Sequence, residues 1–193
     1  MNRLVVVNVV GEMPQRNLRI AGILLAGGRS SRMGENKCFL EYKGKTLIDH
    51  MIDIIKKTSI TDIYISGSID GYQCLEDASA DTYKGPAVAM GHIINTNYNH
   101  YDGFLFVPVD MPLLTSDILE LLMSHECGAY FKDYPLPVFM PAQKIENVIG
   151  SVKNLLAGTS VESLAVPDKY SQMLLNCNTL QDWQEVLDHE HSH

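Results

Sequence analysis

A continuous apolar run leads directly into a basic, glycine-rich loop in the segment Ile20-Ala-Gly-Ile-Leu-Leu-Ala-Gly-Gly-Arg-Ser-Ser-Arg-Met-Gly-Glu-Asn-Lys37. Residues 20–26 do not alternate between apolar and polar, which indicates a strand buried on both faces, as in a parallel sheet. Because this strand ends in Gly27-Gly28, we expect a tight loop at the carboxyl end of the sheet. Open α/β sheets bind their ligands at that edge.

Strands and helices are predicted to alternate along the rest of the chain. Residues 47–55 carry apolar side chains at helical spacing, and Thr46 with Asp49 forms the pattern of a capping pair. Gly85-Pro86 is typical of a helix start and precedes a second helix at 87–95. Further strands are predicted at 63–66, 103–109, 129–132, 136–140 and 173–176, and further helices at 116–125 with Ser116 as N-cap, at 146–157 and at 180–188.

This alternation predicts a three-layer, Rossmann-like α/β fold, in which helices cover both faces of a mostly parallel central sheet. The length of 193 residues fits one domain. We expect this domain to span residues 19–188, between an N-terminal extension at 1–18 and a loose, histidine-containing tail at 189–193.

Composition and charge argue against several classes of function. The net charge of −8 is unlike that of a nucleic-acid binder, whose affinity comes chiefly from basic residues. The apolar runs are far shorter than the roughly 20 residues that span a bilayer, and no signal-peptide pattern is seen, so we expect no membrane partner and a cytoplasmic location. The four cysteines lie 36 to 53 residues apart, unlike those of a zinc or redox site. His50 and His92 are expected to be structural.

The loop after the first strand has the chemistry of a phosphate site. Glycine lets backbone amides approach an anion closely, and Arg29, Arg32 and Lys37 supply positive charge. The spacing matches neither the P-loop nor the dinucleotide-binding pattern. The alternative is that the glycines only turn the chain and the basic side chains are solvated.

The pattern Leu-Ala-Gly-Gly-x-Ser-x-Arg-Met-Gly-x-x-Lys at 25–37, continued by Leu-Glu-Tyr-Lys-Gly-Lys-Thr-Leu-Ile at 40–48, resembles the molybdenum cofactor guanylyltransferases. These are MobA-like enzymes with a nucleotidyltransferase fold. The resemblance implies that Leu25, Ala26, Gly27 and Gly28 contact the base and phosphates of a nucleotide. It implies that Arg32 faces the triphosphate and that Lys37 stabilises charge on the phosphate under attack. The family usually has Asp where this chain has Asn36.

A carboxylate follows the strand predicted at 103–109, in the sequence Val107-Pro-Val-Asp110-Met-Pro112. Mg²⁺ prefers oxygen ligands and often needs only one or two protein carboxylates beside substrate phosphates. On spacing alone, Asp110 could equally serve to turn the chain before Pro112. The resemblance implies that Asp110, in an Asp-x-Pro motif, binds the metal.

Other nucleotide contacts come only from the resemblance. It places Gly85, Pro86 and an upstream Asp near the base and ribose, with Asp77 the better counterpart and Asp81 the second choice. Both carboxylates could instead be solvated loop residues. Ser66 stands where the family often has Asn, and Ala89 stands where it often has Gly. A Ser has fewer hydrogen-bonding groups than an Asn, so the choice of guanine has less support than the fold.

Two asparagines near the C-terminus extend the resemblance over roughly residues 19–188. Asn176 and Asn178 belong to an Asn-x-Asn-Thr motif that is followed by Asp182. On the predicted strand, residues two apart point the same way, and the resemblance places them near the second substrate or the metal. The alternative for Asn178 is to cap the last helix.

The activity implied by the resemblance is transfer of GMP from GTP to molybdopterin or the molybdenum cofactor, with Mg²⁺ as cofactor and pyrophosphate as by-product. The family also implies transient contacts with proteins that deliver or accept the cofactor, in a monomer or small homo-oligomer. The alternatives are a cytidylyltransferase, another nucleotidyltransferase on this fold, or a non-catalytic nucleotide-binding protein.

Overall fold

The structure is a computed structural model that describes residues 18–26, 37–76, 85–146, 148 and 150–190. Its main sheet has seven strands in the order β5-β4-β1-β6-β8-β7-β9. These strands are β1 (Ile20–Leu25), β4 (Asp62–Ser66), β5 (Cys74–Leu75), β6 (Gly103–Pro108), β7 (Ala129–Phe131), β8 (Tyr134–Pro141) and β9 (Glu162–Leu164). Only β8 is antiparallel to its neighbours, β6 and β7, within the described sheet. A separate two-stranded ribbon joins β2 (Glu41–Tyr42) and β3 (Lys45–Thr46).

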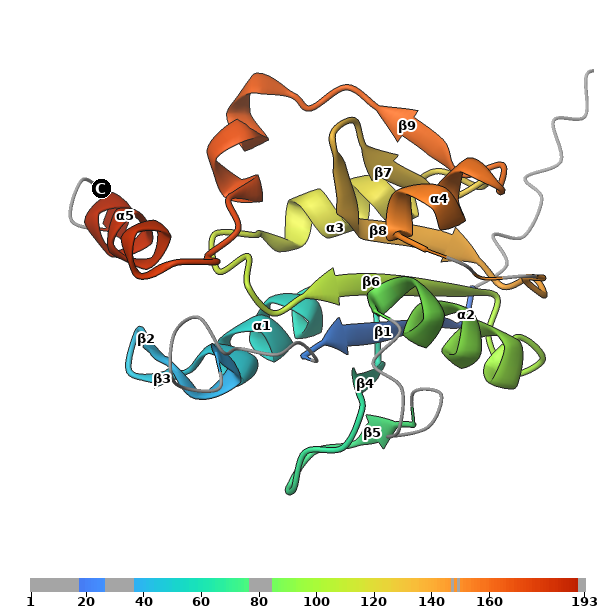
Figure 1. The fold of residues 1–193 in the computed structure, drawn as a ribbon, viewed down its shortest axis with the longest axis horizontal. Coiled ribbons are helices and arrows are strands. Elements are labelled where there is room, and N and C mark those ends of the chain that lie inside the picture. Colours follow the sequence, from blue (N-terminus) through green and yellow to red (C-terminus); the bar gives the residue numbers. More distant parts are fainter. Residues whose placement is uncertain (1–17, 27–36, 77–84, 147, 149, 191–193) are drawn as a thin grey trace, which may run out of the picture.

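Helices cover both faces of the sheet. One buried cluster joins the sheet to α1 (Leu47–Lys56), α3 (Ser116–Met123) and α5 (Leu180–Glu190). The other joins it to α2 (Pro86–Asn97) and α4 (Val152–Ala157), which Figure 1 shows on the face turned toward the viewer. The predicted three-layer fold with a mostly parallel sheet is therefore confirmed. No helix in the described ranges is long and apolar enough to cross a membrane.

The local sequence explains the elements that flank the glycine-rich loop. All of β1 after Ile20 is buried, as the unbroken apolar run predicts. The predicted capping pair at the start of α1 is confirmed, because the Thr46 hydroxyl accepts a hydrogen bond from the Asp49 amide at 3.3 Å. Gly85, at φ 85°, occupies the left-handed region immediately before Pro86 begins α2. The carboxyl end of β1 and the start of α2 therefore lie at the same edge of the sheet.

Close packing of α1 on β1 depends on Gly22. A Cβ on this residue would lie 2.9 Å from Ile55 Cγ2 and 3.3 Å from Ile60 Cγ2, closer than side chains normally pack. The absence of a side chain at Gly22 therefore lets α1 lie near the central strand.

Several predicted boundaries are wrong. Residues 173–176 do not form a strand: a 3₁₀ helix, η2 (Asp168–Leu174), precedes an irregular segment, because Leu174 is buried in the core rather than paired in the sheet. The helix predicted at 146–157 begins only at Val152, since Gly150 takes φ 89° and Ser151 caps the helix. Ser116 is the first residue of α3 and Thr115 holds the N-cap position.

Candidate active site

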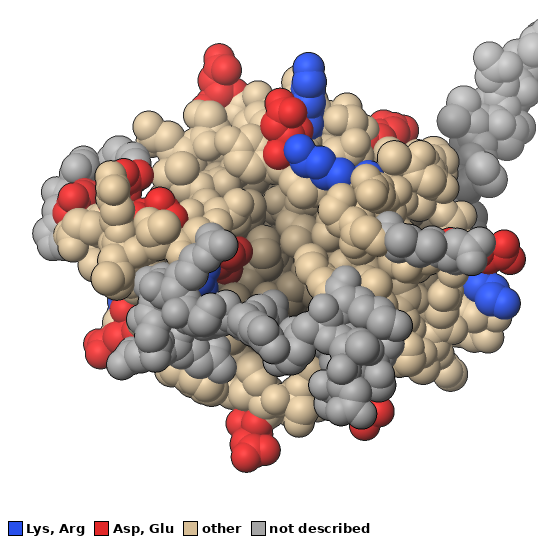
Figure 2. Space-filling view, viewed as in Figure 1, with Lys and Arg blue, Asp and Glu red and all other residues tan. Residues whose placement is uncertain are grey.

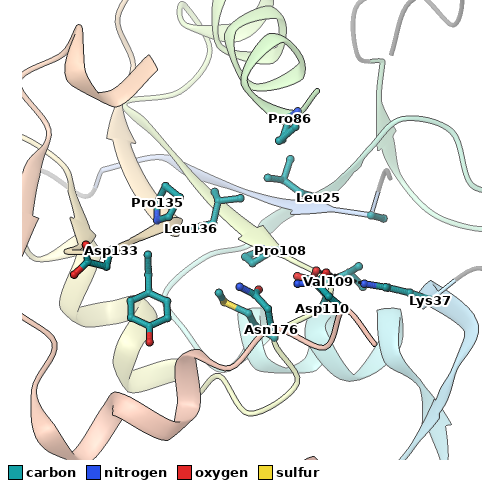
Figure 3. Close-up of a pocket in the computed structure, with 14 residues that line it drawn as sticks. Leu25, Lys37, Pro86, Pro108, Val109, Asp110, Asp133, Pro135, Leu136 and Asn176 are labelled. Carbon is teal, nitrogen blue, oxygen red and sulfur yellow. Dashed lines mark hydrogen bonds and ion pairs between the residues drawn. The ribbon is translucent and has the colours of Figure 1, made fainter. Parts of the chain in front are cut away.

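A cleft of about 460 Å³ opens at the carboxyl ends of β1 and β6. In Figure 2 the face in view is hollowed near its middle. Figure 3 draws the residues that line the cleft, which come from segments far apart in the sequence. They are Leu25, Ala26, Lys37, Pro86, Pro108, Val109, Asp110, Met111, Asp133, Tyr134, Pro135, Leu136, Asn176 and Asn178.

Asp110 lies in this cleft just beyond β6. The amide of Val109 still bonds to the Leu25 carbonyl at 3.2 Å, so the end of β6 is held against β1 up to the residue before Asp110. The Asp110 side chain is 24% exposed. Burial raises its pKa above the usual range for a carboxyl, and the positive charge of Lys37 opposes that rise. Asp110 is therefore a carboxylate that gains from a nearby cation.

Lys37, the residue that follows the glycine-rich loop in the sequence, supplies such a cation. It begins the short 3₁₀ helix η1 (Lys37–Phe39), and its side chain is 15% exposed. Its Nζ donates to the Cys177 carbonyl at 2.7 Å and to Asn178 Oδ1 at 3.0 Å. The same Nζ lies 3.8 Å from Asp110 Oδ2. Figure 3 shows Lys37 and Asp110 facing each other at one end of the cleft.

The segment at 176–178 joins these two residues. The amide of Cys177 donates to the backbone carbonyl of Asp110 at 2.8 Å, which fastens the segment to the end of β6. Asn176 and Asn178 both line the cleft, although neither lies on a strand as predicted. Both asparagines therefore line the cleft without the strand that was predicted to carry them, and their role in binding the second substrate stays a prediction.

The structure describes only some of the residues that were predicted to contact the nucleotide. Leu25, Ala26 and Pro86 line the cleft together, and Figure 3 shows Pro86 near Leu25. Gly85 caps the helix that begins with Pro86. Ser66 is 4% exposed at the end of β4 and is not among the cleft-lining residues. The remaining predicted residues, Gly27, Gly28, Arg32, Asp77 and its alternative Asp81, lie outside the described residues.

Sequence reasoning missed one wall of the cleft. Asp133, in the turn before β8, and the first residues of β8, Tyr134, Pro135 and Leu136, form this wall. Figure 3 labels Asp133, Pro135 and Leu136 at the end opposite Lys37. Asp133 takes φ 69°, a conformation that Asp tolerates in tight turns. The strand was predicted to begin at Leu136, and no residue of 133–136 was among the predicted site residues.

The oxygen-bearing side chains of the cleft suit a metal ion that binds together with its substrate. In the described residues no group of three or more His, Cys, Asp or Glu side chains is placed to hold a metal ion. A cage made wholly of these residues is therefore absent from this part of the chain. Asp110, a partly buried carboxylate in a cleft that also holds the amide side chains of Asn176 and Asn178, matches the few protein ligands that Mg²⁺ uses when phosphates and water complete its shell.

Burial disfavours the thiolate form of the two cysteines near the site. None of the four cysteines, all in the described ranges, forms a disulfide. Burial raises the pKa of the Cys38 thiol, which donates to the Ala26 carbonyl at 3.2 Å. Burial, aided by the charge of Asp110, raises the pKa of Cys177 to about 12. Because the thiolate is the reactive form, both buried residues are better suited to packing beside the cleft than to nucleophilic attack.

Comparison with known proteins identifies a family of similar sequences. The profile of the family described as MobA-like NTP transferase domain matches residues 22–160. The molybdenum cofactor guanylyltransferase of Xanthomonas euvesicatoria pv. vesicatoria is 29% identical over 182 residues, which covers 86% of this chain and 93% of that protein.

Solved structures share the fold. The molybdopterin-guanine dinucleotide biosynthesis protein A of Archaeoglobus fulgidus has a TM-score of 0.68 at 18% identity, and the match covers 90% of this chain and 100% of that one. A Mycobacterium tuberculosis protein in complex with manganese has a TM-score of 0.60 at 16% identity, with 88% and 98% covered.

Proposed function

The chain belongs to the MobA-like NTP transferase family, and from this premise we propose that it is a molybdenum cofactor guanylyltransferase. It transfers GMP from GTP to the terminal phosphate of molybdopterin or its metallated form, and releases pyrophosphate. The observation that carries the proposal is the Lys37–Asp110 pair in the cleft, where a cation and a carboxylate lie 3.8 Å apart at the carboxyl edge of the sheet.

The proposed reaction is an in-line displacement at the α-phosphorus of GTP. An oxygen of the acceptor phosphate forms the new P–O bond, while the bond from the α-phosphorus to the bridging oxygen breaks and its electron pair leaves with pyrophosphate. No general base is needed, because the acceptor phosphate is already ionised. Catalysis then depends on positioning and on neutralising the charge that develops on the phosphates.

Lys37 fits the role of stabilising that charge. Its ammonium is held in place by the Cys177 carbonyl and by Asn178, so it need not be reorganised when the triphosphate binds. Arg32, in the glycine-rich loop, is proposed to face the same phosphates, and the amides of Gly27 and Gly28 to orient them.

Asp110 is the residue proposed to hold Mg²⁺. The ion, when bound, would neutralise phosphate charge during the transfer. Asp110 fits this role because it is a partly buried carboxylate just beyond the carboxyl end of β6, where burial raises its pKa and the nearby Lys37 ammonium opposes that rise. The complex of a Mycobacterium tuberculosis protein of this fold with manganese adds support for a divalent cation.

The two substrates are proposed to occupy opposite parts of the cleft. Leu25, Ala26 and Pro86 line the part proposed for the guanosine, with Gly85, Ser66 and Asp77 as the further nucleotide contacts expected from the family. Residues 133–136 line the part left for the acceptor, and Asn176 and Asn178 are proposed to contact the acceptor from the side of Lys37.

The decisive experiment supplies purified protein with molybdopterin, Mg²⁺ and either GTP or CTP, and identifies the dinucleotide product by mass. A guanine dinucleotide together with pyrophosphate is the expected result, and Asp110→Asn should abolish most of it. A cytosine dinucleotide alone would transfer the protein to the cytidylyltransferases. No product with either nucleotide, from folded protein and intact acceptor, would overturn the proposal.

A further inference from the structure

A capping box begins α5 directly after the cleft-lining segment. Asp182 Oδ2 accepts hydrogen bonds from the amides of Asn178 and Thr179, each at 2.8 Å. In return, the Asp182 amide donates to Thr179 Oγ1 at 3.1 Å. The two backbone amides hold the pKa of Asp182 below its usual range, so this carboxylate is ionised at neutral pH.

The first of these amides belongs to the peptide group that also holds Lys37. The carbonyl of Cys177 and the N–H of Asn178 are the two ends of one planar peptide unit, and they point in opposite directions. Lys37 Nζ donates to the carbonyl end at 2.7 Å, and Asp182 accepts from the N–H end at 2.8 Å. A carboxylate and an ammonium therefore bind opposite ends of the same rigid dipole.

This arrangement has two physical consequences. Fixing the N–H end of a planar group fixes the direction of its carbonyl, and with it the position of the Lys37 ammonium. Charges at both ends also polarise the peptide in the same sense, which strengthens both hydrogen bonds. Asn178, whose amide nitrogen is held by Asp182, gives Lys37 a second acceptor through Oδ1 at 3.0 Å.

We propose that Asp182 is a positioning residue for the transfer reaction, which acts through the Cys177–Asn178 peptide to hold the Lys37 ammonium toward the phosphates. It lies outside the set of cleft-lining residues and acts only through other groups. The proposal rests on the proposed function for its kinetic consequence, but the geometry that it describes belongs to the unliganded protein.

The same cap provides a matched control. Thr179→Ala removes the hydroxyl that accepts from the Asp182 amide, and leaves both backbone amides bonded to the Asp182 carboxylate. Asp182→Ala removes both bonds from those amides. The two variants therefore weaken the same helix start, but only Asp182→Ala breaks the connection to Lys37.

The kinetic test measures kcat and KM for GTP with saturating acceptor and Mg²⁺. Asp182→Ala should lower kcat by about tenfold or more, whereas Thr179→Ala should stay within about threefold of the parent. Asp182→Asn keeps an acceptor oxygen and should lose less than Asp182→Ala, which also covers the case in which the alanine variant folds poorly. In the Lys37→Ala background, Asp182→Asn should cost no further activity, because residues that act as one unit are not additive. Losses that multiply in the double variant, or equal losses in Thr179→Ala and Asp182→Ala, would overturn the proposal.

A second measurement reports on the Lys37 ammonium directly and does not depend on catalytic activity. In protein labelled with ¹⁵N-lysine, the ammonium signal of Lys37, assigned by its loss in Lys37→Arg, should show slow proton exchange because of its hydrogen bonds. That signal should persist in Thr179→Ala and broaden or vanish in Asp182→Ala. An unchanged signal in folded Asp182→Ala would overturn the positioning role. If the signal responds as expected but no nucleotide is transferred, the proposed function fails while the positioning of Lys37 by Asp182 stands.

Discussion

The Lys37 ammonium lies 3.8 Å from Asp110 Oδ2, and the backbone of Cys177 bonds to both residues. Three distant parts of the chain thus meet at one end of the cleft. One cation and one carboxylate therefore lie side by side where the triphosphate and its metal are proposed to bind. Substitution of either side chain tests the proposed chemistry directly.

Removal of the Lys37 ammonium should slow transfer without unfolding the protein. We expect Lys37→Ala to lower kcat by about 10²- to 10³-fold, as seen when one preorganised donor to a developing negative charge is lost. Pyrophosphate release in the steady state measures the effect. Lys45→Ala is the control, because Lys45 pairs with Asp53 at 2.6 Å on the surface, away from the cleft-lining residues. A Lys37→Ala variant within a factor of a few of the parent would contradict the role given to this residue.

Asp110→Asn should separate activity from stability. The variant keeps the shape of the side chain but loses a carboxylate oxygen for the metal, so we expect a loss of at least about 10²-fold in transfer that added Mg²⁺ does not restore. Because burial raises the pKa of Asp110, its ionised form is disfavoured in the fold, and the unliganded variant should melt no lower than the parent at neutral pH. Asp117→Asn, an exposed change on α3, serves as control and should alter neither quantity. Activity retained by Asp110→Asn would argue against Asp110 as the metal ligand.

His50 should make the protein less stable in mild acid. Burial lowers the pKa of this imidazole, whose Nε2 bonds to the Pro112 carbonyl at 2.9 Å. In the unfolded chain His50 binds a proton more readily. The free energy of unfolding should therefore be highest above the unfolded pKa of about 6.5, and should fall as the pH drops through that value. Urea unfolding of parent and His50→Gln between about pH 5 and 8 measures this. The variant should show a flatter slope, whereas His92→Gln, on the exposed side of α2, should keep the parent slope.

Gly22→Ala should destabilise the fold by about 1–3 kcal/mol, because the new methyl group overpacks the contact between β1 and α1. The added Cβ would lie 2.9 Å from Ile55 Cγ2. Gly158→Ala is the matched control, since a Cβ there meets its nearest atom at 3.5 Å and the backbone φ is −89°. Urea unfolding of both variants measures the difference, and equal stabilities would contradict the close packing described for α1.

Local sequence patterns predicted those helices and strands whose start or burial depends on neighbouring residues in the sequence. The unbroken apolar run of β1, the Thr46 cap of α1 and the Gly85-Pro86 start of α2 each specify a structure without reference to distant segments. Lys37 and Asp110 could be assigned to one cleft because both follow elements of a parallel sheet at its carboxyl edge. Their roles came from the resemblance, and these remain proposals.

The C-terminal third could not be predicted in the same way. Residues 173–176 look apolar enough for a strand, but the sheet edge is taken by β9, which pairs with β7 and has mostly exposed side chains. An exposed edge strand carries no apolar alternation, so its sequence gives no periodic signal. The wall at 133–136 was missed for a related reason, since its position depends on how the start of β8 lies against the cleft.

By itself, the sequence determined which residues prefer a strand, a helix start or a glycine turn, and which side chains carry charge suited to a triphosphate. Only the tertiary structure decided that the Cys177–Asn178 peptide lies between Lys37 and Asp182. The bond from Lys37 to Asn178 spans 141 residues of chain. Periodicity and capping specify how a segment is buried, but not which distant segment it meets, and that choice is made by the packing of the whole sheet and its helices.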